Sequence, residues 1–209
     1  MKLLLISDTH TKHDQLKLPP TDILIHAGDV SSRGTKAEII DFLNWLEKQK
    51  ATHKIFIAGN HDFFFENESP EEINALIPKN ITYLNDSGIT INGLNIWGSP
   101  VSPWFHDWAF NRQRGEDINK HWKLIPENTD ILITHGPAYG ILDRTIGNEL
   151  VGCEDLLKRV QAIKPKLFVF GHIHEAYGMK QVEGTDFINA SVLNVKYQQV
   201  NAPVEYILG

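Results

Sequence analysis

Five short apolar runs constrain the fold of this chain more than any other feature of its sequence. They occupy residues 3–6, 23–25, 55–58, 131–133 and 167–170, and none of them alternates between apolar and polar side chains. A strand that is apolar on both sides must be covered on both faces, as happens in a sheet flanked by other layers. The runs therefore predict the inner strands of a layered α/β structure.

Helical patterns lie between these runs. The clearest spans residues 36–48, where apolar side chains share one face and Thr35 forms a capping box with Glu38. A second helix is expected to begin at Ser69, followed by a proline in the first helical position. A third has an apolar face over residues 153–163 and must end before the next proline.

Alternating apolar and polar residues predict further strands at 88–91, 94–97, 186–190 and 204–208, some of them antiparallel. Together the patterns favour an α/β fold in which two sheets pack face to face with helices outside. A length of 209 residues suits one domain, so residues 1–209 are expected to form a single unit.

Charge and cysteine content limit the classes of function. Lys plus Arg number 20 and Asp plus Glu number 26, so the net charge is −6 and the chain repels nucleic-acid backbones as a whole. An anionic substrate must then be neutralised locally, by a metal or a few fixed donors.

The one cysteine, Cys153, cannot form an internal disulfide, which predicts a core thiol and a cytoplasmic protein. No apolar run approaches the roughly 20 residues that span a bilayer, so no membrane partner is expected.

Polar residues of metal-binding types follow each of the five predicted inner strands. The segments are Asp8-Thr9-His10, Gly28-Asp29, Gly59-Asn60-His61-Asp62, His135-Gly136 and Gly171-His172-Ile173-His174. Sites in open α/β sheets are built at the carboxyl ends of strands, so these five loops are expected to converge. Asp, Asn and His are ligands for Mn, Fe, Zn or Mg, and the chain has no thiolate set for a structural zinc. The pattern predicts a catalytic metal site with open positions.

Taken one at a time, these segments have ordinary explanations. Asp8 can cap a turn, His10 can simply pack, and Gly28-Asp29 is a weaker signal still. Segment 59–62 is stronger because three polar groups there would be costly to bury unpaired, and segment 171–174 adds two imidazoles in one loop. Their shared position after buried strands is what favours a functional site.

In this order the five segments resemble the signature of the calcineurin-like metallophosphoesterases. Further segments resemble the small subfamily of metallophosphoesterase domain-containing proteins, and the likeness runs from residue 2 to residue 208. These segments are 97–100, 103–105, 134–137, 152–153, 165–178 and 188–191. The resemblance implies a four-layer α/β/β/α sandwich of two mixed β-sheets flanked by helices, with a dinuclear site at one end of the sheets.

The resemblance also implies a role for each site residue. One divalent ion would be held by Asp8, His10, Asp29 and His174, and the other by Asp29, Asn60, His135 and His172. Asp29 would bridge the ions, His61 would be an unliganded proton donor, and Asp62 would orient His61. Manganese is the expected metal, with Fe, Zn, Mg, Ni or Co as alternatives.

These roles predict a metal-dependent phosphoesterase in which a hydroxide bridging two ions attacks phosphorus and His61 protonates the leaving alkoxide. A phosphodiesterase acting on small nucleotide-like esters is preferred on the subfamily resemblance alone. A phosphomonoesterase with the same site remains an alternative, as does a metal- or nucleotide-binding regulatory module with negligible turnover. The net charge disfavours a nuclease, and the oligomeric state is left open.

Other residues of the chain carry weaker expectations. His26, His53 and His121 are expected to be structural or at the surface, whereas His13 and His106 are left open.

Aromatic side chains at 63–65 and 97–110 are expected mainly in the core, with one or two lining the crevice to stack on a nucleobase or an aromatic leaving group. Arg112, Arg114 and Arg144 are candidate phosphate contacts, and no motif selects among them.

Overall fold

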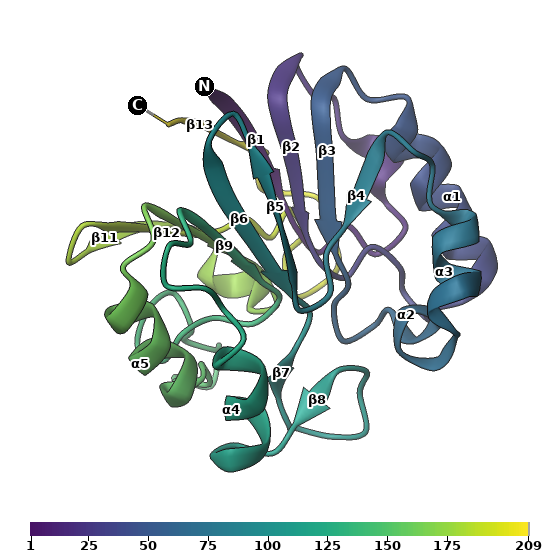
Figure 1. The fold of residues 1–209 in the computed structure, drawn as a ribbon. Helices are drawn as coiled ribbons and strands as arrows, with labels where there is room; N and C mark the ends of the chain where they lie inside the picture. Colours follow the sequence, from purple (N-terminus) through teal and green to yellow (C-terminus); the bar gives the residue numbers. More distant parts are fainter. Residues whose placement is uncertain (209) are drawn as a thin grey trace.

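Two β-sheets stacked face to face form the centre of the computed structural model, which describes residues 1–208 (Figure 1). The first sheet has the strand order β13-β1-β2-β3-β4, and the second has the order β11-β12-β10-β9-β6-β5. The strands of the first sheet are β1 (Lys2–Ile6), β2 (Thr21–Ala27), β3 (Ala51–Ile57), β4 (Ile81–Tyr83) and β13 (Val204–Ile207). Those of the second are β5 (Ser87–Ile91), β6 (Leu94–Ser99), β9 (Ile131–Thr134), β10 (Leu167–Phe170), β11 (Gly178–Val182) and β12 (Thr185–Asn189). A separate pair joins β7 (Ser102–Pro103) to β8 (Asn111–Arg112).

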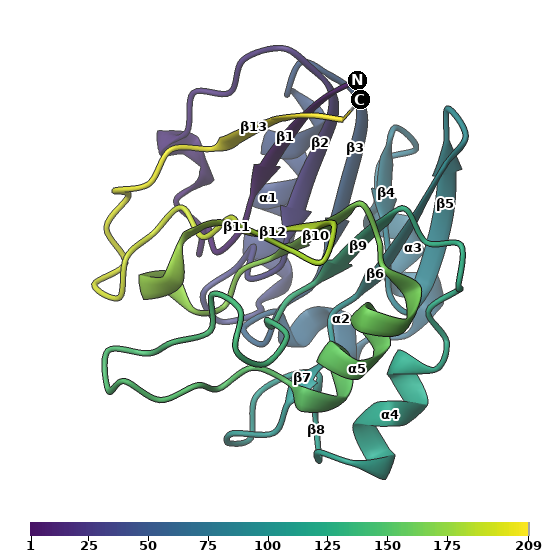
Figure 2. The same ribbon diagram turned by 90° about the vertical axis from the view of Figure 1, so that its left-hand side faces the viewer.

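Helices cover the outer face of each sheet (Figures 1 and 2). The first sheet is covered by α1 (Lys36–Glu47), α2 (Phe63–Asn67) and α3 (Pro70–Leu76), and the second by α4 (Glu116–Trp122) and α5 (Glu154–Ile163). Two short 3-10 helices, η1 (His13–Gln15) and η2 (His174–Ala176), lie in loops. The predicted capping box is present, since the Thr35 hydroxyl accepts from the Glu38 N–H and the Glu38 carboxylate accepts from the Thr35 N–H. The Cys153 thiol is buried and unpaired, and it caps α5 by accepting from the Leu156 N–H.

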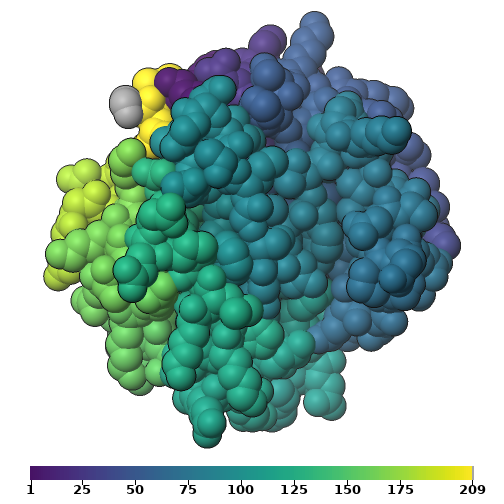
Figure 3. Space-filling view, in the orientation of Figure 1, coloured from purple at the N-terminus to yellow at the C-terminus, as the bar shows by residue number. Residues whose placement is uncertain are grey.

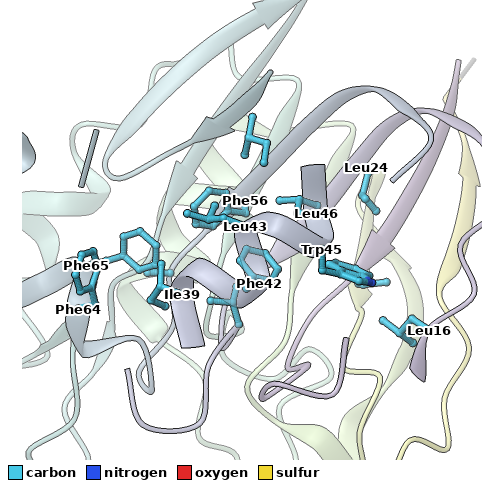
Figure 4. Close-up of a cluster of buried hydrophobic side chains, with 14 of the residues drawn as sticks. Leu16, Leu24, Ile39, Phe42, Leu43, Trp45, Leu46, Phe56, Phe64 and Phe65 are labelled. Carbon is cyan, nitrogen blue, oxygen red and sulfur yellow. The ribbon is translucent and has the colours of Figure 1, made fainter. Parts of the chain in front are cut away.

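Three apolar layers follow from the alternation of side chains along the strands. Leu3 and Leu5 face the second sheet, whereas Leu4 and Ile6 face the helices on the other side. Figure 4 shows the layer between the first sheet and its helices, where Phe42 and Phe56 meet with ring centroids 5.4 Å apart. The remaining layers lie between the two sheets and between the second sheet and α4 and α5. The four-layer α/β/β/α arrangement of two mixed sheets is therefore confirmed.

Some elements were not expected from the sequence. Strand β4 has only three residues, and β11 is an edge strand whose Met179 and Lys180 are exposed, so neither presents a buried apolar run. Helix α4 is one of two short helices that the periodicity did not reveal, although Ile118 and Trp122 anchor it in the core. None of the helices in residues 1–208 is both long enough and apolar enough to cross a membrane.

The carboxyl ends of the inner strands meet at one end of the stacked sheets. Strands β1, β2 and β3 run parallel, as do β6, β9, β10 and β12 in the other sheet. A parallel bridge between Ser7 and Ser191 joins the two sheets directly beyond β1 and β12. At the surface, the C-terminal segment (yellow) lies against the N-terminal residues (purple) in Figure 3, as expected from the pairing of β13 with β1. Five strand-end loops thereby face the same space.

Candidate metal centre

The loops that follow the inner strands have an unusual backbone. Four of the candidate ligands have positive φ angles, namely 56° at Asp8, 41° at His10, 55° at Asp29 and 68° at His172. Residues other than glycine rarely adopt this conformation, and such strain is concentrated at functional sites. Hydrogen bonds between loops hold the strained segments in place, with the N–H of His10 donating to the Asp29 carbonyl at 3.0 Å.

Glycines let two pairs of these loops approach each other closely. A Cβ atom on Gly171 would collide with the Asp8 carboxylate, and one on Gly59 would collide with the Asp29 carboxylate. In both cases the glycine of one motif makes room for the carboxylate of another. The glycines therefore help to assemble the site across distant parts of the chain.

The first group of ligand atoms comes from Asp8, His10 and His174, which lie within 4.8 Å of one another. The Nε2 atom of His174 is 3.4 Å from Asp8 Oδ1 and 3.4 Å from His10 Nε2. The other ring nitrogen of His174, Nδ1, is 3.1 Å from the Asn194 carbonyl oxygen. Because a carbonyl only accepts, Nδ1 carries the hydrogen and the neutral ring presents a lone pair at Nε2.

The second group is built in the same way around His135. Its Nδ1 donates to the Ala27 carbonyl at 3.0 Å, so the lone pair of the neutral ring is again at Nε2. This atom lies 2.9 Å from Asn60 Oδ1 and 3.4 Å from Asp29 Oδ2. His172 lies beside the group, with its ring centroid 5.0 Å from that of His135. Its backbone N–H donates to the Asp8 carboxylate at 3.1 Å.

Asp29 connects the two groups through a single atom. Its Oδ2 lies 3.5 Å from His10 Nε2 in the first group and 3.4 Å from His135 Nε2 in the second. The other oxygen, Oδ1, accepts from the backbone N–H of His61 at 2.8 Å. This contact fixes the carboxylate with one oxygen directed between the two groups.

The residues of both groups fit divalent cations. Carboxylate oxygens, an amide oxygen and imidazole lone pairs converge in a space where Asp8, His10, Asp29 and His135 are all buried. Acceptor atoms brought this close repel one another unless a proton or a cation lies between them. The donor set of oxygen and imidazole nitrogen suits Mn, Fe, Zn or Mg.

The pKa values describe how the metal-free protein meets this requirement. Burial alone would lower the pKa of His135 and His174, but the carboxylates of Asp29 and Asp8 outweigh it and raise both to about 9. Despite their burial, the pKa of each carboxyl group lies well below its ordinary value because of the same histidines. Burial lowers the pKa of His10 to about 4, which keeps that imidazole neutral for ligation. Protons thus occupy the places that suit cations.

His61 lies at the edge of the first group, with a potential ligand atom within 4.8 Å of those of His10 and Asp29. Its Nδ1 is 2.8 Å from the Ser32 carbonyl, which leaves Nε2 free. We expected Asp62 to orient this ring, and the structure shows a different partner. The buried Asp62 carboxylate accepts from the backbone N–H groups of residues 30, 31 and 59 and from the Ser31 hydroxyl, at 2.6–3.1 Å. It therefore joins two ligand loops instead of holding the imidazole.

Several contacts of the site are not predicted by any pattern in the sequence. Ser191 donates its hydroxyl to Asp8 Oδ2 at 2.7 Å, and it belongs to segment 188–191, which had contributed only to the family resemblance. The carbonyls of Ala27, Ser32 and Asn194 orient three histidines. Every residue has a carbonyl, so no sequence signal distinguishes these three.

The remaining histidines lie outside the two groups. His26 is buried with Nε2 2.9 Å from the Thr9 hydroxyl, and His121 pairs with Asp86 at 2.6 Å. His13, which the sequence left open, is buried with Nε2 3.3 Å from the Asp41 carboxylate. His53 is half-buried on β3 and His106 is exposed.

Among the aromatic side chains at residues 63–65 and 97–110, two contact the candidate ligands or His61. The Phe105 ring lies 5.1 Å from that of His172, and the Trp108 ring lies 4.3 Å from that of His61. Phe64, Phe65 and Phe110 are buried in the core as expected, while Phe63 is only partly buried and its ring lies 6.0 Å from that of Trp108.

The three arginines have partners within the chain. The Arg112 guanidinium pairs with Glu66 at 3.1 Å, and that of Arg144 donates to Asn148 Oδ1 at 2.7 Å. Arg114 donates to two backbone carbonyls and also lines a cleft of about 350 Å³ next to His172. The other lining residues are mostly apolar: Pro103, Trp104, Phe105, Gly136, Pro137, Thr145, Val151 and Ile173.

Comparisons with known proteins agree with this geometry. A family model described as calcineurin-like phosphoesterase matches residues 1–176. Human metallophosphoesterase domain-containing protein 1 is 41% identical over 97% of this chain and 69% of its own length. The UPF0046 protein K07C11.7 of Caenorhabditis elegans is 36% identical over all of this chain and 75% of its own.

Solved structures show the same fold at low sequence identity. Phosphopantetheinyl hydrolase from Mycobacterium tuberculosis superimposes with a TM-score of 0.61 at 17% identity, covering 94% of this chain and 90% of that one. TT1561 of Thermus thermophilus gives a TM-score of 0.61 at 12% identity, covering 90% and 88% of the two chains. These likenesses support the layered architecture described above.

Proposed function

The chain belongs to the calcineurin-like phosphoesterase family, and on that premise we propose that it hydrolyses small nucleotide-like phosphodiesters with two divalent metal ions. Family membership makes it a metal-dependent phosphoesterase. The number of ions, manganese as the preferred metal and the preference for diesters belong to the proposal. So does a cytoplasmic setting, which rests on the single buried and unpaired thiol of Cys153.

The observation that carries the proposal is the position of Asp29 Oδ2. This atom lies at nearly equal distances from His10 Nε2 and His135 Nε2, 3.5 Å and 3.4 Å. A carboxylate in that position can neutralise two cations at once. Asp8, His10 and His174 would complete one ligand set, and Asn60, His135 and His172 would complete the other.

Divalent ions held by these residues would supply an activated water and neutralise the phosphoryl oxygens during displacement. The chain itself provides the proton for the leaving oxygen. His61 is half-buried, its Nδ1 hydrogen is bound to the Ser32 carbonyl, and a second proton on Nε2 can be given to the leaving group. Trp108 packs against this ring and limits its rotation.

The cleft beside His172 supports a substrate with an organic substituent. Its volume of about 350 Å³ and its apolar lining, which includes Phe105 and Pro137, suit a planar or apolar group attached to the phosphate. The net charge of −6 supports a small substrate instead of a nucleic acid, since the chain as a whole repels long polyanions.

The test reloads metal-stripped protein with Mn²⁺, Mg²⁺, Zn²⁺, Fe²⁺, Ni²⁺ or Co²⁺ in separate samples. Bound metal is measured by elemental analysis, and turnover is measured on bis(p-nitrophenyl) phosphate and p-nitrophenyl phosphate. We expect activity to return with two ions per chain, to be highest with Mn²⁺, and to be faster on the diester.

Asp29→Ala should lose one or both ions and nearly all turnover, because Asp29 Oδ2 lies 3.5 Å from His10 Nε2 of one ligand set and 3.4 Å from His135 Nε2 of the other. Asp22→Ala is the matched control, since Asp22 lies at the opposite end of β2 and its carboxylate accepts from the Lys2 N–H at 2.8 Å. Two tightly held ions in Asp29→Ala would refute the bridge. Comparable rates on the monoester would favour the phosphomonoesterase alternative, and metal binding without turnover on any ester would favour the regulatory module.

A further inference from the structure

Tyr197 lies in a turn between β12 and β13 that extends beyond the residues matched by the family model, which end at 176. The turn belongs to the yellow segment of Figure 2. The Tyr197 ring contacts both histidines of the first ligand group edge to face. Its centroid is 4.8 Å from that of His10, at an interplanar angle of 78°, and 5.5 Å from that of His174, at 77°.

The backbone of this turn is strained and held from several sides. Tyr197 has a φ of 56°, which is unfavourable for a bulky residue. The Asn194 side chain accepts from the N–H groups of Lys196 and Gln198 at 2.9 and 3.0 Å, and the Tyr197 N–H donates to the Asn194 carbonyl at 2.8 Å. The ammonium group of Lys12, two residues after His10, donates a hydrogen bond to the Tyr197 carbonyl. Contacts from two loops therefore impose a conformation that tyrosine would not adopt by itself.

The same turn also sets the tautomer and the orientation of one ligand, His174. The Asn194 carbonyl accepts the Nδ1 hydrogen of His174 at 3.1 Å, which directs Nε2 of that ring toward Asp8. The histidines of the second group are supported from elsewhere, His135 by the Ala27 carbonyl and His172 by the Phe105 ring. The turn thus acts on one half of the metal centre.

We propose that two residues of the turn at 194–198 position the ligands of the ion held by Asp8, His10 and His174, Asn194 through its carbonyl and Tyr197 through its ring. Edge-to-face contacts keep both imidazoles aimed at the ion, and the ring shields them from solvent. The inference rests on the proposed function only in assigning a metal ion to these three ligands. Tyr197 is a positioning residue because it acts through His10 and His174.

The test compares Tyr197→Ala with Tyr197→Phe and with the control Val195→Ala. Val195 lies in the same turn and is exposed to nearly the same extent as Tyr197, 42% against 40%. Metal-stripped protein is titrated with Mn²⁺, without substrate, by calorimetry and electron paramagnetic resonance. We expect Tyr197→Ala to bind one of two ions about 10-fold more weakly, as is typical when support of a metal ligand is lost. Tyr197→Phe and Val195→Ala should bind both ions like the unmodified protein.

Two further backgrounds identify the affected ion. In Asn60→Ala, which impairs the second ligand set, Tyr197→Ala should weaken the remaining ion. In His174→Ala, which impairs the first set, Tyr197→Ala should not change the affinity for the remaining ion. Thermal unfolding of the metal-free variants verifies that each is folded.

Several outcomes would overturn the inference. Equal weakening of both ions would mean that Tyr197 only supports the fold, and a loss in Tyr197→Phe as large as in Tyr197→Ala would assign the effect to the hydroxyl. Unchanged metal binding in Tyr197→Ala, with a raised KM when the metal-loaded variant is then assayed on bis(p-nitrophenyl) phosphate, would make the ring a wall of the substrate site. If the unmodified protein bound no ions, the proposed function would fail together with this inference, whereas two ions bound equally by all variants would reject this inference alone.

Discussion

Individual backbone carbonyls determine how the histidines of the metal centre present their nitrogen atoms. Ala27, Ser32 and Asn194 each accept from Nδ1 of a different histidine, at 2.8–3.1 Å. A carbonyl has no hydrogen to donate, so each contact selects one tautomer of the neutral ring. In all three rings the atom left for chemistry is Nε2. The site therefore depends on backbone positions as much as on the identity of its side chains.

At the residue scale, His61→Gln separates a proton donor from a metal ligand. If His61 protonates the leaving oxygen, this variant should keep its metal content and lose about 10²- to 10⁴-fold in turnover on an ester with an alkoxide leaving group. The loss should be much smaller for a nitrophenolate ester, because nitrophenolate departs without a proton. Metal analysis and rates on both esters provide the measurement.

The structure makes this experiment necessary, since His61 has a potential ligand atom within 4.8 Å of those of His10 and Asp29. Equal losses on the two esters with both ions retained would reject the proton donor. A loss of one ion would instead place His61 among the ligands. Neither result would affect the assignment as a phosphoesterase.

The raised pKa values of His135 and His174 predict how the metal-free protein responds to pH. Both values are about 9 in the folded chain against an ordinary value of 6.5, so the folded state binds the protons more tightly than the unfolded state. Their contribution to stability is present in full below pH 6.5 and is lost as the pH rises to 9. Neutral histidines then leave the negative charges of Asp8 and Asp29 without a compensating positive charge, and only hydrogen-bond donors such as the Ser191 hydroxyl and the His61 N–H still face them.

We therefore expect the unfolding temperature of chelator-treated protein to fall between pH 6.5 and pH 9. The metal-loaded protein is the control, because ions replace the protons and the histidines are already neutral. Its unfolding temperature should change much less over the same range. Parallel pH curves for the two forms would contradict the assignment of protons and metals to the same positions.

At the scale of elements, the close approach of strand-end loops depends on glycine. A side chain on Gly171, directly after β10, would collide with the carboxylate of Asp8, which lies two residues beyond the end of β1. Gly171→Ala should therefore displace Asp8 and reduce metal content and turnover together. Gly147→Ala is the control, since a Cβ there would meet only the Thr145 hydroxyl at an ordinary 3.6 Å. Full metal content in Gly171→Ala would show that the loops can separate without losing the site.

At the scale of the whole molecule, the two sheets share one apolar layer. Leu3 and Ile25 of the first sheet pack in the same cluster as Ile133 and Val169 of the second, and all four are buried. Separating the sheets would expose this layer, so neither sheet has a complete core by itself. The metal centre draws ligands from loops of both sheets, and it should be lost when they separate.

Residues 1–209 are accordingly expected to unfold as one cooperative unit. Calorimetry of the metal-free protein should show a single transition whose calorimetric and van't Hoff enthalpies agree. Two resolved transitions would contradict the prediction of a single domain. Loading with metal should raise the temperature of this single transition without splitting it into two, because the ions bind only the folded chain.

Much of this architecture was predictable from local patterns. Uninterrupted apolar runs such as residues 55–58 indicate strands that are buried on both faces, and the polar residues after each run indicate where the strand ends. These patterns predicted two stacked sheets with helices outside, and the resemblance of the motifs implied the four-layer sandwich and the family; both are confirmed. The structure brings all nine predicted site residues to one end of the sheets, while their individual roles stay predictions.

Tertiary structure alone decided how those residues contact one another. Asp62 was expected to orient His61 and instead accepts hydrogen bonds from the loop at residues 30–31, and no sequence pattern marks Tyr197 as a neighbour of two candidate ligands. A local pattern records residue type and burial over a few positions along the chain. Contacts between residues more than 150 positions apart, such as Tyr197 and His10, depend on how two separate sheets are stacked, and carbonyls that orient imidazoles are chemically the same at every residue.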